Sequence, residues 1–397
     1  MVHPNAATDD GAPRPATDLV HHGRHPQEQH GFVNPPVYRG STVLFPTMAK
    51  LETGDQPYRY GRLGTPTTQA LETLIAKVEG GDLTCLTPSG LGAVTNAMLA
   101  FVTTGDHILV TDSVYAPTRR FCDGVLKRLG VETTYYDPLI GADITRLFRD
   151  NTAFVFTESP GSQTFEMQDI PAIAAAARAR NIWVLMDNTW ASPHFFKPFK
   201  HGVDVSIQAA TKYIVGHADA MLGSITASAR AASRVQEACR LLGNNPGSEE
   251  VYLGLRGMRT LDVRLEKHMR SGLAMARWLS DRPEVARVMH PGLPEAPGHA
   301  LWQRDFEGAS GLFGFTLQPR FAKPAVAAML DGLKLFGMGY SWGGFESLLI
   351  PFDPRSYRTA TTWDEPGQAL RIHVGLEDIA DLKADLEAGF ARMNAMT

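Results

Sequence analysis

From Thr65 onward, the hydrophobic residues alternate between helical periodicity and short apolar runs. Residues 65–81 have the pattern of an amphipathic helix that ends at a Gly-Gly pair, and residues 92–104 form a second helical stretch before Gly105. Another helical stretch covers residues 169–181. The apolar runs lie at 107–111, 131–136, 153–159, 182–187, 203–208 and 221–228. Continuous apolar strands that alternate with helices predict a mainly parallel sheet with helices on both faces.

The pattern changes at both ends of the chain. Residues 1–63 carry Gly, Pro and Tyr but little periodicity, which indicates an extended arm. After Leu261 comes a long helical stretch, and strand patterns at 311–318 and 369–376 precede a final helix over 381–393. We therefore predict an α/β protein with a mainly parallel sheet, seven-stranded when the strand-like run just before residue 89 is included, and a smaller α+β domain. The expected parts are an arm (1–63), a large domain (64–259) and a small domain (260–397).

Charge and hydropathy narrow the classes of function. The formal net charge is -4, and no run of Lys and Arg appears, which argues against nucleic-acid and polybasic membrane binding. No apolar run approaches the roughly 20 residues of a membrane span, and the N-terminal residues lack an apolar signal core. We expect a cytoplasmic protein that acts on a small molecule.

Cysteine and histidine give little indication of a metal. The cysteines form no CxxC pair, so neither a disulfide framework nor a zinc site is predicted, and we expect them to be reduced. They are Cys85, Cys122 and Cys239. The cluster His21, His22 and His25 is compatible with a metal site or a polar tail. Because no carboxylate or cysteine completes a ligand set, a polar tail is favoured.

Two features can serve an anionic or electron-poor ligand. Residues 89–93 (SGLGA) follow a strand-like run and open a helix, so their free N–H groups can hold a phosphate, although such turns are also common structural joints. Asp187 ends an apolar strand, where its carboxylate faces the ligand edge of a parallel sheet unless it caps the next turn.

Lys212 and Arg371 can each be interpreted as a residue of a ligand site or as a surface residue. Lys212 lies four residues after a buried strand, where desolvation lowers a lysine pKa toward the free amine that Schiff-base chemistry needs. Arg371 alternates with the apolar residues of 369–376 and can bind a carboxylate bidentately. Each is otherwise a solvated surface residue. Taken together, a phosphate cradle, an acid, an amine and a carboxylate clamp are the groups that pyridoxal phosphate (PLP) with an amino-acid substrate requires.

The residue sequences of these motifs resemble those of the Cys/Met metabolism family of fold-type I PLP enzymes. The similarity extends from about His22 to Phe390. The matching segments are YGRLGTPT (60–67), SGLGAV (89–94), SVYAPT (113–118), ESPGS (158–162), MDNTWASP (186–193), QAATKYIVGHADAMLG (208–223), SWGGFES (341–347) and ALRIHVGLED (369–378). So many matches in the same order are specific for this family.

The resemblance implies a role for each cofactor residue. Lys212 carries PLP as a Schiff base, Asp187 faces the ring nitrogen, and Tyr115 stacks on the ring. The phosphate is implied to be held by Gly90, Leu91 and Thr211 of the same chain, and by Tyr60 and Arg62 of a neighbouring subunit. The implied assembly is a homotetramer, a dimer of dimers with shared active sites, and the arm then packs on a partner.

The resemblance also implies substrate contacts and a reaction. Arg371 and Ser341 are expected to receive the α-carboxylate region, with Trp342 and Tyr60 beside the substrate. Within the family, the sequence is most similar to bacterial members that catalyse β-elimination of L-cystathionine to homocysteine, pyruvate and ammonia in methionine biosynthesis. Related γ-acting enzymes typically carry Glu-Ser-Leu-Gly-Gly, whereas this chain has Tyr-Ser-Trp-Gly-Gly at 340–344. A bulky Trp342 can narrow the space around the β and γ carbons.

Several alternatives remain open at this stage. A broad cysteine-S-conjugate β-lyase, a γ-lyase acting on cystathionine or methionine, and a non-catalytic PLP-binding protein share the same scaffold. Ala209 departs from the family, which usually has a phosphate-binding Ser there. One of Arg119 and Arg120 is a candidate for the distal carboxylate of the substrate, against a solvated helix start.

Overall fold

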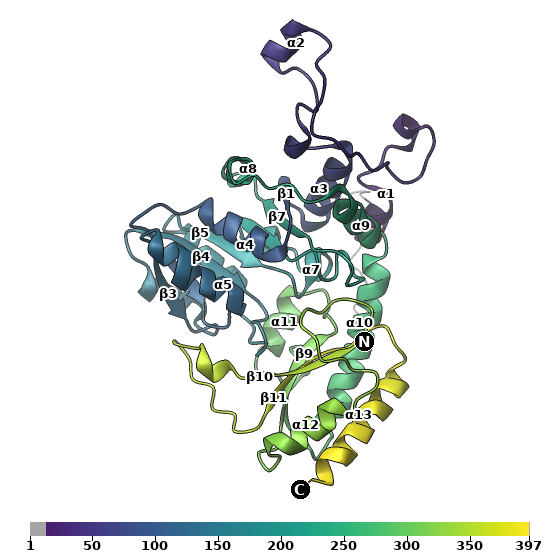
Figure 1. Ribbon diagram of the computed structural model, residues 1–397. Helices are drawn as coiled ribbons and strands as arrows, with labels where there is room; N and C mark the ends of the chain where they lie inside the picture. The colour runs from purple at the N-terminus through teal and green to yellow at the C-terminus, as the bar shows by residue number, and fades with distance from the viewer. Residues whose placement is uncertain (1–12, 397) are drawn as a thin grey trace.

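The structure, a computed structural model, describes residues 13–396 and contains two separate sheets (Figure 1). The larger sheet has seven strands in the order β1-β7-β6-β5-β4-β2-β3. They are β1 (Leu83–Thr87), β2 (His107–Thr111), β3 (Glu132–Tyr136), β4 (Thr152–Glu158), β5 (Trp183–Asp187), β6 (Val205–Gln208) and β7 (Gly223–Ala227). Strands β3, β2, β4, β5 and β6 run parallel, and β7 pairs antiparallel with both β6 and β1. The predicted mainly parallel seven-stranded sheet is therefore confirmed.

Helices cover both faces of this sheet because its central strands are apolar on both sides. In β2, Ile108 and Val110 belong to one apolar core and Leu109 belongs to the other. The helices α4 (Gly90–Leu99) and α8 (Ala232–Leu241) contribute to the first core. The helices α3 (Pro66–Glu79), α6 (Ile170–Arg178) and α9 (Ser248–Met258) contribute to the second. The sheet is therefore packed between two helical layers, and its central strands are accessible mainly at their ends.

Local sequence signals explain where the helices begin and end. The helix predicted over 65–81 is α3, with Thr65 as its N-cap and Gly80 in the left-handed conformation after its last turn. The prediction of 92–104 was wrong at both ends. Helix α4 begins at Gly90 because the Ser89 hydroxyl accepts a hydrogen bond from Gly92 N. It ends early because the chain turns so that Phe101 packs into the core.

The smaller sheet forms a second layer with its own helices. Its antiparallel strands follow the order β10-β11-β9-β8. They are β8 (Val285–Met289), β9 (Leu312–Leu317), β10 (Leu348–Phe352) and β11 (Ala369–His373). The helices of this region are α10 (Leu261–Ser280), α11 (His299–Asp305), α12 (Lys323–Asp331) and α13 (Ile379–Asn394). The sequence analysis missed the two edge strands, β8 and β10. Strand β10 carries Pro351, whose missing N–H is tolerated at the edge of a sheet.

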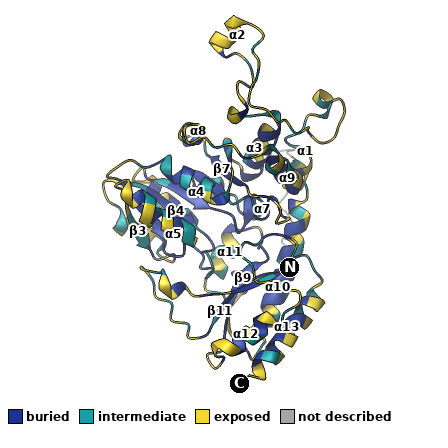
Figure 2. Cartoon of the chain, in the orientation of Figure 1, coloured by how far each residue is buried: buried dark blue, intermediate teal, exposed yellow. Residues whose placement is uncertain are grey.

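The N-terminal segment leaves the body of the molecule as an arm (Figure 1). It is not entirely without helix, since α1 (Pro15–His21) and α2 (Met48–Thr53) form within it. Leu19 of α1 is buried, but Phe32 and Leu44 are 71% and 84% exposed. Figure 2 shows exposed residues along much of this arm, whereas most strands of the two sheets are buried. The part of the arm prediction that covers residues 1–12 lies outside the described residues.

Residues 13–396 lack two kinds of feature, a membrane-spanning helix and a metal-binding cluster. Within that range, no helix is long and apolar enough to cross a membrane. The same residues contain no group of three or more His, Cys, Asp or Glu side chains placed to hold a metal ion. His21 instead lies 2.9 Å from an Arg24 guanidinium nitrogen on the arm. The three cysteines are free thiols.

Helix α9 packs directly against the loop that follows β6, which carries Lys212. A Cβ atom on Gly257 would lie 2.1 Å from Ile214 O and 2.5 Å from Val215 O. Only glycine therefore permits this approach. Gly124, on the helical segment after α5 (Ala116–Phe121), has open space around the same position.

We predict that Gly257→Ala destabilises the protein by about 1–3 kcal/mol, because the added methyl group overpacks a backbone contact. Gly124→Ala is the matched control and is expected to leave stability unchanged or to raise it slightly. Chemical denaturation of both variants checks this. Equal denaturation midpoints for the two variants would show that the loop after β6 can shift to accept the methyl group without loss of stability.

Candidate active site

A cavity of about 650 Å³ lies at the carboxyl ends of the parallel strands, between the large sheet and the small one. It is lined by residues of α4, the β2–α5 loop, β5, the loop after β6, residues 340–342 and β11. The sequence-predicted residues that line it are Gly90, Leu91, Tyr115, Asp187, Thr211, Lys212, Ser341, Trp342 and Arg371. Tyr60 and Arg62 do not line it. This is the ligand position expected for an open α/β sheet.

Lys212 is held in the cavity with a depressed pKa. Burial, together with the positive charge of Arg371, lowers the pKa of its amine to about 8, and Asp187 offsets part of this effect. Its Nζ atom donates a hydrogen bond to Ser341 Oγ. The ammonium also lies 5.2 Å from the centroid of the Trp342 ring. A substantial fraction of free amine near neutral pH makes this lysine a competent nucleophile and base.

Asp187 faces the cavity from the end of β5. Its Oδ1 atom accepts hydrogen bonds from Thr189 N (3.0 Å) and Thr189 Oγ1 (2.5 Å), whereas Oδ2 has no protein partner within residues 13–396. Burial raises the pKa of this carboxyl, and the bonds from Thr189 and the charge of Lys212 counteract only part of the rise. A cationic N–H donor beside Oδ2 would stabilise the carboxylate.

The N-terminus of α4 forms the other end of the cavity. Gly90 N and Leu91 N have no acceptor in the part of the chain that the structure describes. A Cβ on Gly90 would lie 2.4 Å from Ala209 Cβ, so glycine is needed for α4 to approach the loop after β6. Thr211 lines the cavity, but its hydroxyl donates to Leu222 O and accepts from Leu222 N. The free N–H groups and the helix dipole suit a phosphate.

Ser341 is positioned by an unusual backbone conformation and by contacts from the small sheet. Its φ of 75° lies in the left-handed region, which is costly for a non-glycine residue. Arg371 Nη2 donates to Ser341 O at 2.9 Å, and the neighbouring Gly343 N donates to Nε2 of His373. These contacts fix residues 341–343 directly over Lys212, since a Cβ on Gly343 would lie 3.0 Å from Lys212 Cα.

Arg371 itself retains unused hydrogen-bonding capacity. Its buried Nε atom has no hydrogen-bond partner within the described residues, and burial lowers the pKa of the guanidinium to about 10. A desolvated guanidinium group that lines a cavity and keeps a donor free is suited to a carboxylate ligand.

Tyr115 is anchored through its backbone. It is the residue before α5, and its N–H donates to Glu158 Oε2 at 2.7 Å. Glu158 ends β4 opposite Asp187 of β5. Burial and the nearby charge of Asp187 raise the pKa of Glu158 well above its usual value. Tyr115 lines the cavity, and this bond anchors its backbone there.

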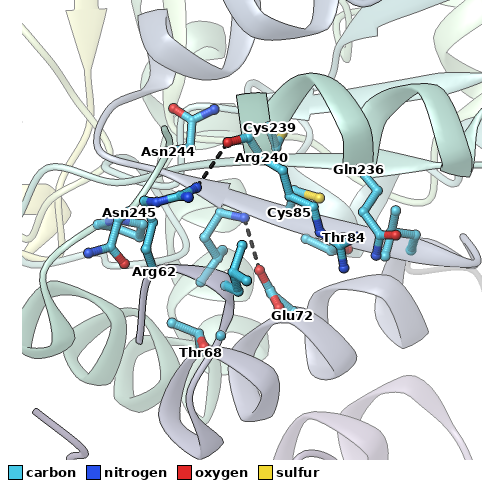
Figure 3. Close-up of a pocket in the computed structure, with 15 residues that line it drawn as sticks. Arg62, Thr68, Glu72, Thr84, Cys85, Gln236, Cys239, Arg240, Asn244 and Asn245 are labelled. Atoms are coloured by element: carbon cyan, nitrogen blue, oxygen red, sulfur yellow. Dashed lines mark hydrogen bonds between the residues drawn. The ribbon is translucent and has the colours of Figure 1, made fainter. Parts of the chain in front are cut away.

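Arg62 lies at a second, smaller cavity of about 100 Å³ between the arm, β1 and α8 (Figure 3). Its Nη1 atom donates to Arg240 O at the C-terminal end of α8. Cys85 and Cys239, far apart in sequence, line the same cavity. Tyr60 is exposed nearby on the arm. Neither Tyr60 nor Arg62 contacts the large cavity of its own chain.

Arg119 does not face the large cavity. It is 5% exposed and forms an ion pair with buried Asp112, with Nη2 2.6 Å from Oδ1. Its guanidinium group also covers the Tyr135 ring at 3.6 Å from the centroid. The hypothesis that either Arg119 or Arg120 meets the substrate therefore fails for Arg119, whose charge is already neutralised. Arg120 does line the cavity.

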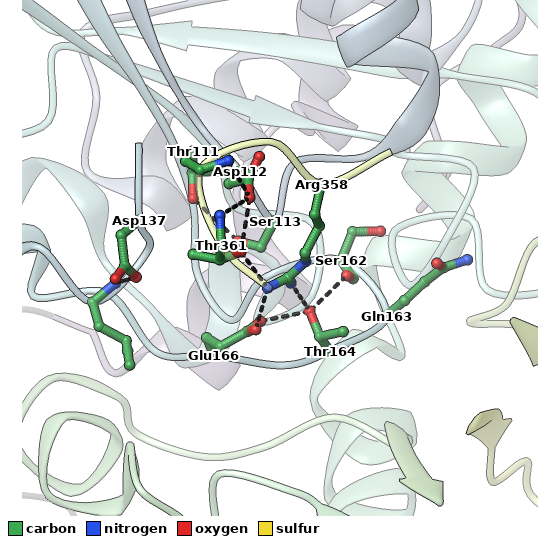
Figure 4. Close-up of polar contacts among 12 residues, drawn as sticks. Thr111, Asp112, Ser113, Asp137, Ser162, Gln163, Thr164, Glu166, Arg358 and Thr361 are labelled. Carbon is green, nitrogen blue, oxygen red and sulfur yellow. Dashed lines mark hydrogen bonds and ion pairs between the residues drawn. The ribbon is translucent and has the colours of Figure 1, made fainter. Parts of the chain in front are cut away.

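Asp112 is the anchor of a segment that we call the strap, residues 356–361 (Figure 4). Its carboxylate accepts backbone N–H bonds from Thr359, Ala360 and Thr361, in addition to the Thr361 hydroxyl. The strap also contacts residues 163–166, which form one wall of the cavity. Arg358, which is in the strap, pairs with Glu166 at 2.8 Å. The strap thus ties the small-sheet region to this wall.

Similarity to known proteins decides the family. The model of the Cys/Met metabolism PLP-dependent enzymes matches residues 16–391. The chain belongs to this family. A protein of Rhizobium johnstonii is 53% identical over 386 residues, with 96% of each chain covered. Cystathionine beta-lyase of Salmonella typhimurium is 45% identical, with 95% of this chain and 98% of that protein covered.

A solved structure gives the same result for the fold. Cystathionine gamma-lyase from Lactobacillus plantarum, complexed with L-serine, has a TM-score of 0.88 and 30% identity. The alignment covers 96% of this chain and 100% of that one. The fold is that of the fold-type I enzymes, and PLP is the cofactor of this Cys/Met metabolism enzyme. The site residues fit it, since an amine, a carboxylate with a free oxygen and a helix N-terminus face one cavity.

Sequence reasoning missed two residues of this Cys/Met metabolism enzyme that shape the site. Thr189 links Asp187 to the loop after β6, because its hydroxyl also accepts a bond from Ala209 N at 2.9 Å. It therefore stands beside the position where a serine was expected. A threonine two residues after a strand-end aspartate is a turn signal that indicates this contact. Glu158 was recognisable as a second carboxylate at the same strand edge.

We predict that Asp112→Asn destabilises the enzyme by about 3–5 kcal/mol at neutral pH, because it removes the charge that pairs with buried Arg119. Burial raises the Asp112 pKa, but bonds from Thr359, Thr361 and Arg119 outweigh it and leave the pKa below its usual value. A depressed folded-state pKa stabilises the fold above the unfolded pKa of about 3.9. The difference from wild type should therefore shrink as pH falls below about 4.

Asp353→Asn provides the control, since Asp353 precedes the strap and pairs with exposed Arg355. Denaturation curves at several pH values measure both variants. A pH-independent difference for Asp112→Asn would contradict the role of its charge.

Proposed function

We propose that this PLP enzyme is a cystathionine β-lyase, which converts L-cystathionine to homocysteine, pyruvate and ammonia in the cytoplasm. The observation that carries the proposal is the position of the Lys212 amine, which shares one cavity with Asp187, Ser341 and Arg371. Its pKa of about 8 suits a base that takes a proton from a substrate carbon. The Salmonella typhimurium relative of that name supports the choice of reaction.

Different residues of the cavity bind different parts of the cofactor and the substrate. The N–H groups of Gly90 and Leu91 would hold the phosphate of the cofactor, and Asp187 would keep a proton on its ring nitrogen. Tyr115, whose backbone N–H donates to Glu158, would pack against the ring. Arg371 binds the α-carboxylate of the substrate through the donors that it leaves free within the protein.

Lys212 carries out the proton transfers. Bound PLP supplies an electron sink for the electron pair at the substrate Cα. With its amine free, Lys212 would take the Cα proton, and Ser341 Oγ would orient its Nζ atom through the hydrogen bond that it accepts. The Cβ–S bond would then break, and the proton that Lys212 took from Cα would pass to the sulfur, which leaves as a thiol. One molecule of water would convert the remaining three-carbon fragment to pyruvate and ammonia. Because one residue anchors the cofactor and then acts as base, its pKa must stay near the working pH.

Trp342 favours β-elimination over γ-elimination. It lines the cavity beside Lys212, and it packs against Tyr213 at 5.5 Å between ring centroids. This contact restricts movement of the indole away from the substrate. A wide ring next to the lysine limits the space in which a proton could be removed from Cβ, a step that γ-elimination requires. A γ-lyase, as in the Lactobacillus plantarum structure, and a broad cysteine-S-conjugate β-lyase are the competing activities.

The proposed assembly is a homotetramer in which the arm contacts a neighbouring subunit. Exposed apolar residues on the arm support this, since Phe32, Leu44 and Met48 lack a cover in the single chain. Arg62 and Tyr60 then complete the phosphate site of the neighbour. The proposed division of the chain follows the same assembly, with the arm (1–63) before the large domain (64–259) and the small domain (260–397).

We predict that the purified enzyme with PLP and L-cystathionine releases pyruvate and homocysteine, and that Lys212→Ala lowers the rate at least about a hundredfold. Lys127→Ala, an exposed lysine outside the cavity, serves as the control and should retain the wild-type rate. Product analysis distinguishes the reactions. Release of 2-oxobutyrate and cysteine would establish γ-elimination instead.

We also predict that hybrids of Lys212→Ala and Arg62→Ala subunits are more active than either variant alone. In such a hybrid, one site combines an intact Lys212 from one chain with an intact Arg62 from the other. Co-expression with two different affinity tags isolates the hybrids, which are assayed at limiting PLP.

Hybrids of Lys212→Ala with Asp187→Asn are the control. These two residues line one cavity of the same chain, so no hybrid site is complete and no recovery is expected. Equal activity of the two kinds of hybrid would refute the sharing of sites between subunits.

A further inference from the structure

Cys85 and Cys239 are far apart in the sequence but meet at the smaller cavity (Figure 3). Cys85 belongs to β1 and Cys239 to α8, two elements that pack against each other. The side chains of the two residues are close enough to share a hydrogen bond, and both are free thiols. Two thiols in contact on neighbouring elements can form a disulfide with little movement of the backbone.

The smaller cavity gives this pair access to a small reagent. Cys85 is half-buried and Cys239 is 7% exposed, and both line the cavity. Its volume of about 100 Å³ admits a molecule as small as hydrogen peroxide, since one water needs only about 10–15 Å³. The third cysteine differs, because Cys122 is 1% exposed and lines neither cavity.

The two thiols of the pair are not equivalent. The hydrogen bond with Cys85 and a second one with Asn244 lower the pKa of the Cys239 thiol, against the opposing effect of burial. The same contact with Cys239, together with burial, raises the pKa of Cys85. The thiolate is the nucleophilic form of cysteine, so Cys239 is the thiol that attacks an oxidant. Cys85 is then the second thiol, which closes the disulfide.

Glu72 supplies a proton acceptor at the same cavity. Burial raises the pKa of its carboxyl to about 7, and the hydrogen bond from Leu86 N to Oε1 counteracts part of this rise. A carboxyl group with such a pKa is partly ionised at neutral pH, so it can take a proton from a thiol and give it up again.

We propose that Cys85 and Cys239 form a reversible disulfide when the enzyme meets a peroxide. The Cys239 proton passes to Glu72, and the Cys239 sulfur attacks one oxygen of hydrogen peroxide. An S–O bond forms, the O–O bond breaks, and the released hydroxide takes the proton from Glu72 and becomes water. The Cys85 sulfur then attacks the Cys239 sulfur, so that an S–S bond forms and the S–O bond breaks. Hydroxide leaves with the Cys85 proton as a second water.

The two sulfur atoms together lose two electrons, which the peroxide takes up, and a dithiol reverses the oxidation by exchange. The disulfide holds the end of α8 against β1. Arg240 follows Cys239, and its carbonyl oxygen accepts the bond from Arg62 Nη1 at 2.9 Å, so the anchor of Arg62 is held as well. The oxidation does not depend on the proposed β-lyase reaction, since neither thiol lines the large cavity.

The test exposes the native, PLP-loaded enzyme to hydrogen peroxide, blocks the remaining thiols and identifies the joined peptides by mass spectrometry. We expect the number of free thiols to fall from three to one, because the bridge uses two of them. The peptides that contain Cys85 and Cys239 should be linked until a dithiol separates them. Cys122→Ser is the control and should form the same bridge.

Single variants test the order of the two steps. In Cys85→Ser, oxidation of Cys239 should stop at the sulfenic acid, which dimedone traps. In Cys239→Ser, Cys85 should remain a thiol at the same peroxide dose. Equal dimedone labelling of the two variants would overturn the assignment of Cys239 as the attacking thiol.

Three results would overturn the disulfide itself. The first is a wild-type enzyme that keeps all its free thiols after exposure to peroxide. The second is a bridge to Cys122 or between two chains. The third is a Cys85–Cys239 bridge that forms no faster in the folded enzyme than in the urea-unfolded chain, because the fold would then contribute nothing to the reaction.

Discussion

The site depends on the burial of the Lys212 amine, which must be shielded from water although it carries the chemistry. Lys212 follows a fully buried strand, and its backbone is locked by bonds from its own N–H to Ala209 O and from Gly216 N to its carbonyl. Burial therefore acts on the amine while the main chain stays fixed, and the pKa falls to about 8. The close approach of Gly257 and Gly343 to this loop leaves no room for the lysine to retreat.

Two regions of the chain must keep a fixed relative position to form this environment around Lys212. The loop after β6 belongs to the large sheet, whereas Ser341 and Arg371 come from the small-sheet region. The strap holds the two regions together at a distance from the lysine, because the Asp112 carboxylate accepts hydrogen bonds from five donors of strap residues 359–361. A carboxylate can accept several donors at once, and a buried one requires them. The polar cluster therefore defines the cavity wall that apolar packing alone would leave loosely specified.

The sequence predicted the large sheet well because its strands are apolar on both faces and separated by helices with clear end signals. It failed where a tertiary contact decides the boundary, as at Phe101, or where proline disguises an edge strand, as at Pro351. The residues expected around the large cavity came together there, apart from Tyr60 and Arg62. The different surroundings of Arg119 and Arg120 could not be predicted from the sequence. Arg119 is buried because the fold places it against Asp112, which also anchors the strap.

Each of the charged groups of the cavity is destabilised by burial, which explains why they suit a cofactor and an anionic substrate. Burial shifts the pKa of Lys212 and Arg371 downward and the pKa of Asp187 upward, so each group is displaced toward its neutral form. None of the three is fully compensated within the described protein. A ligand that brings an aldehyde, a protonated ring nitrogen and a carboxylate supplies a partner to each group. The binding of that ligand is therefore coupled to the ionisation of the site, and the free energy of desolvating these groups favours the occupied state.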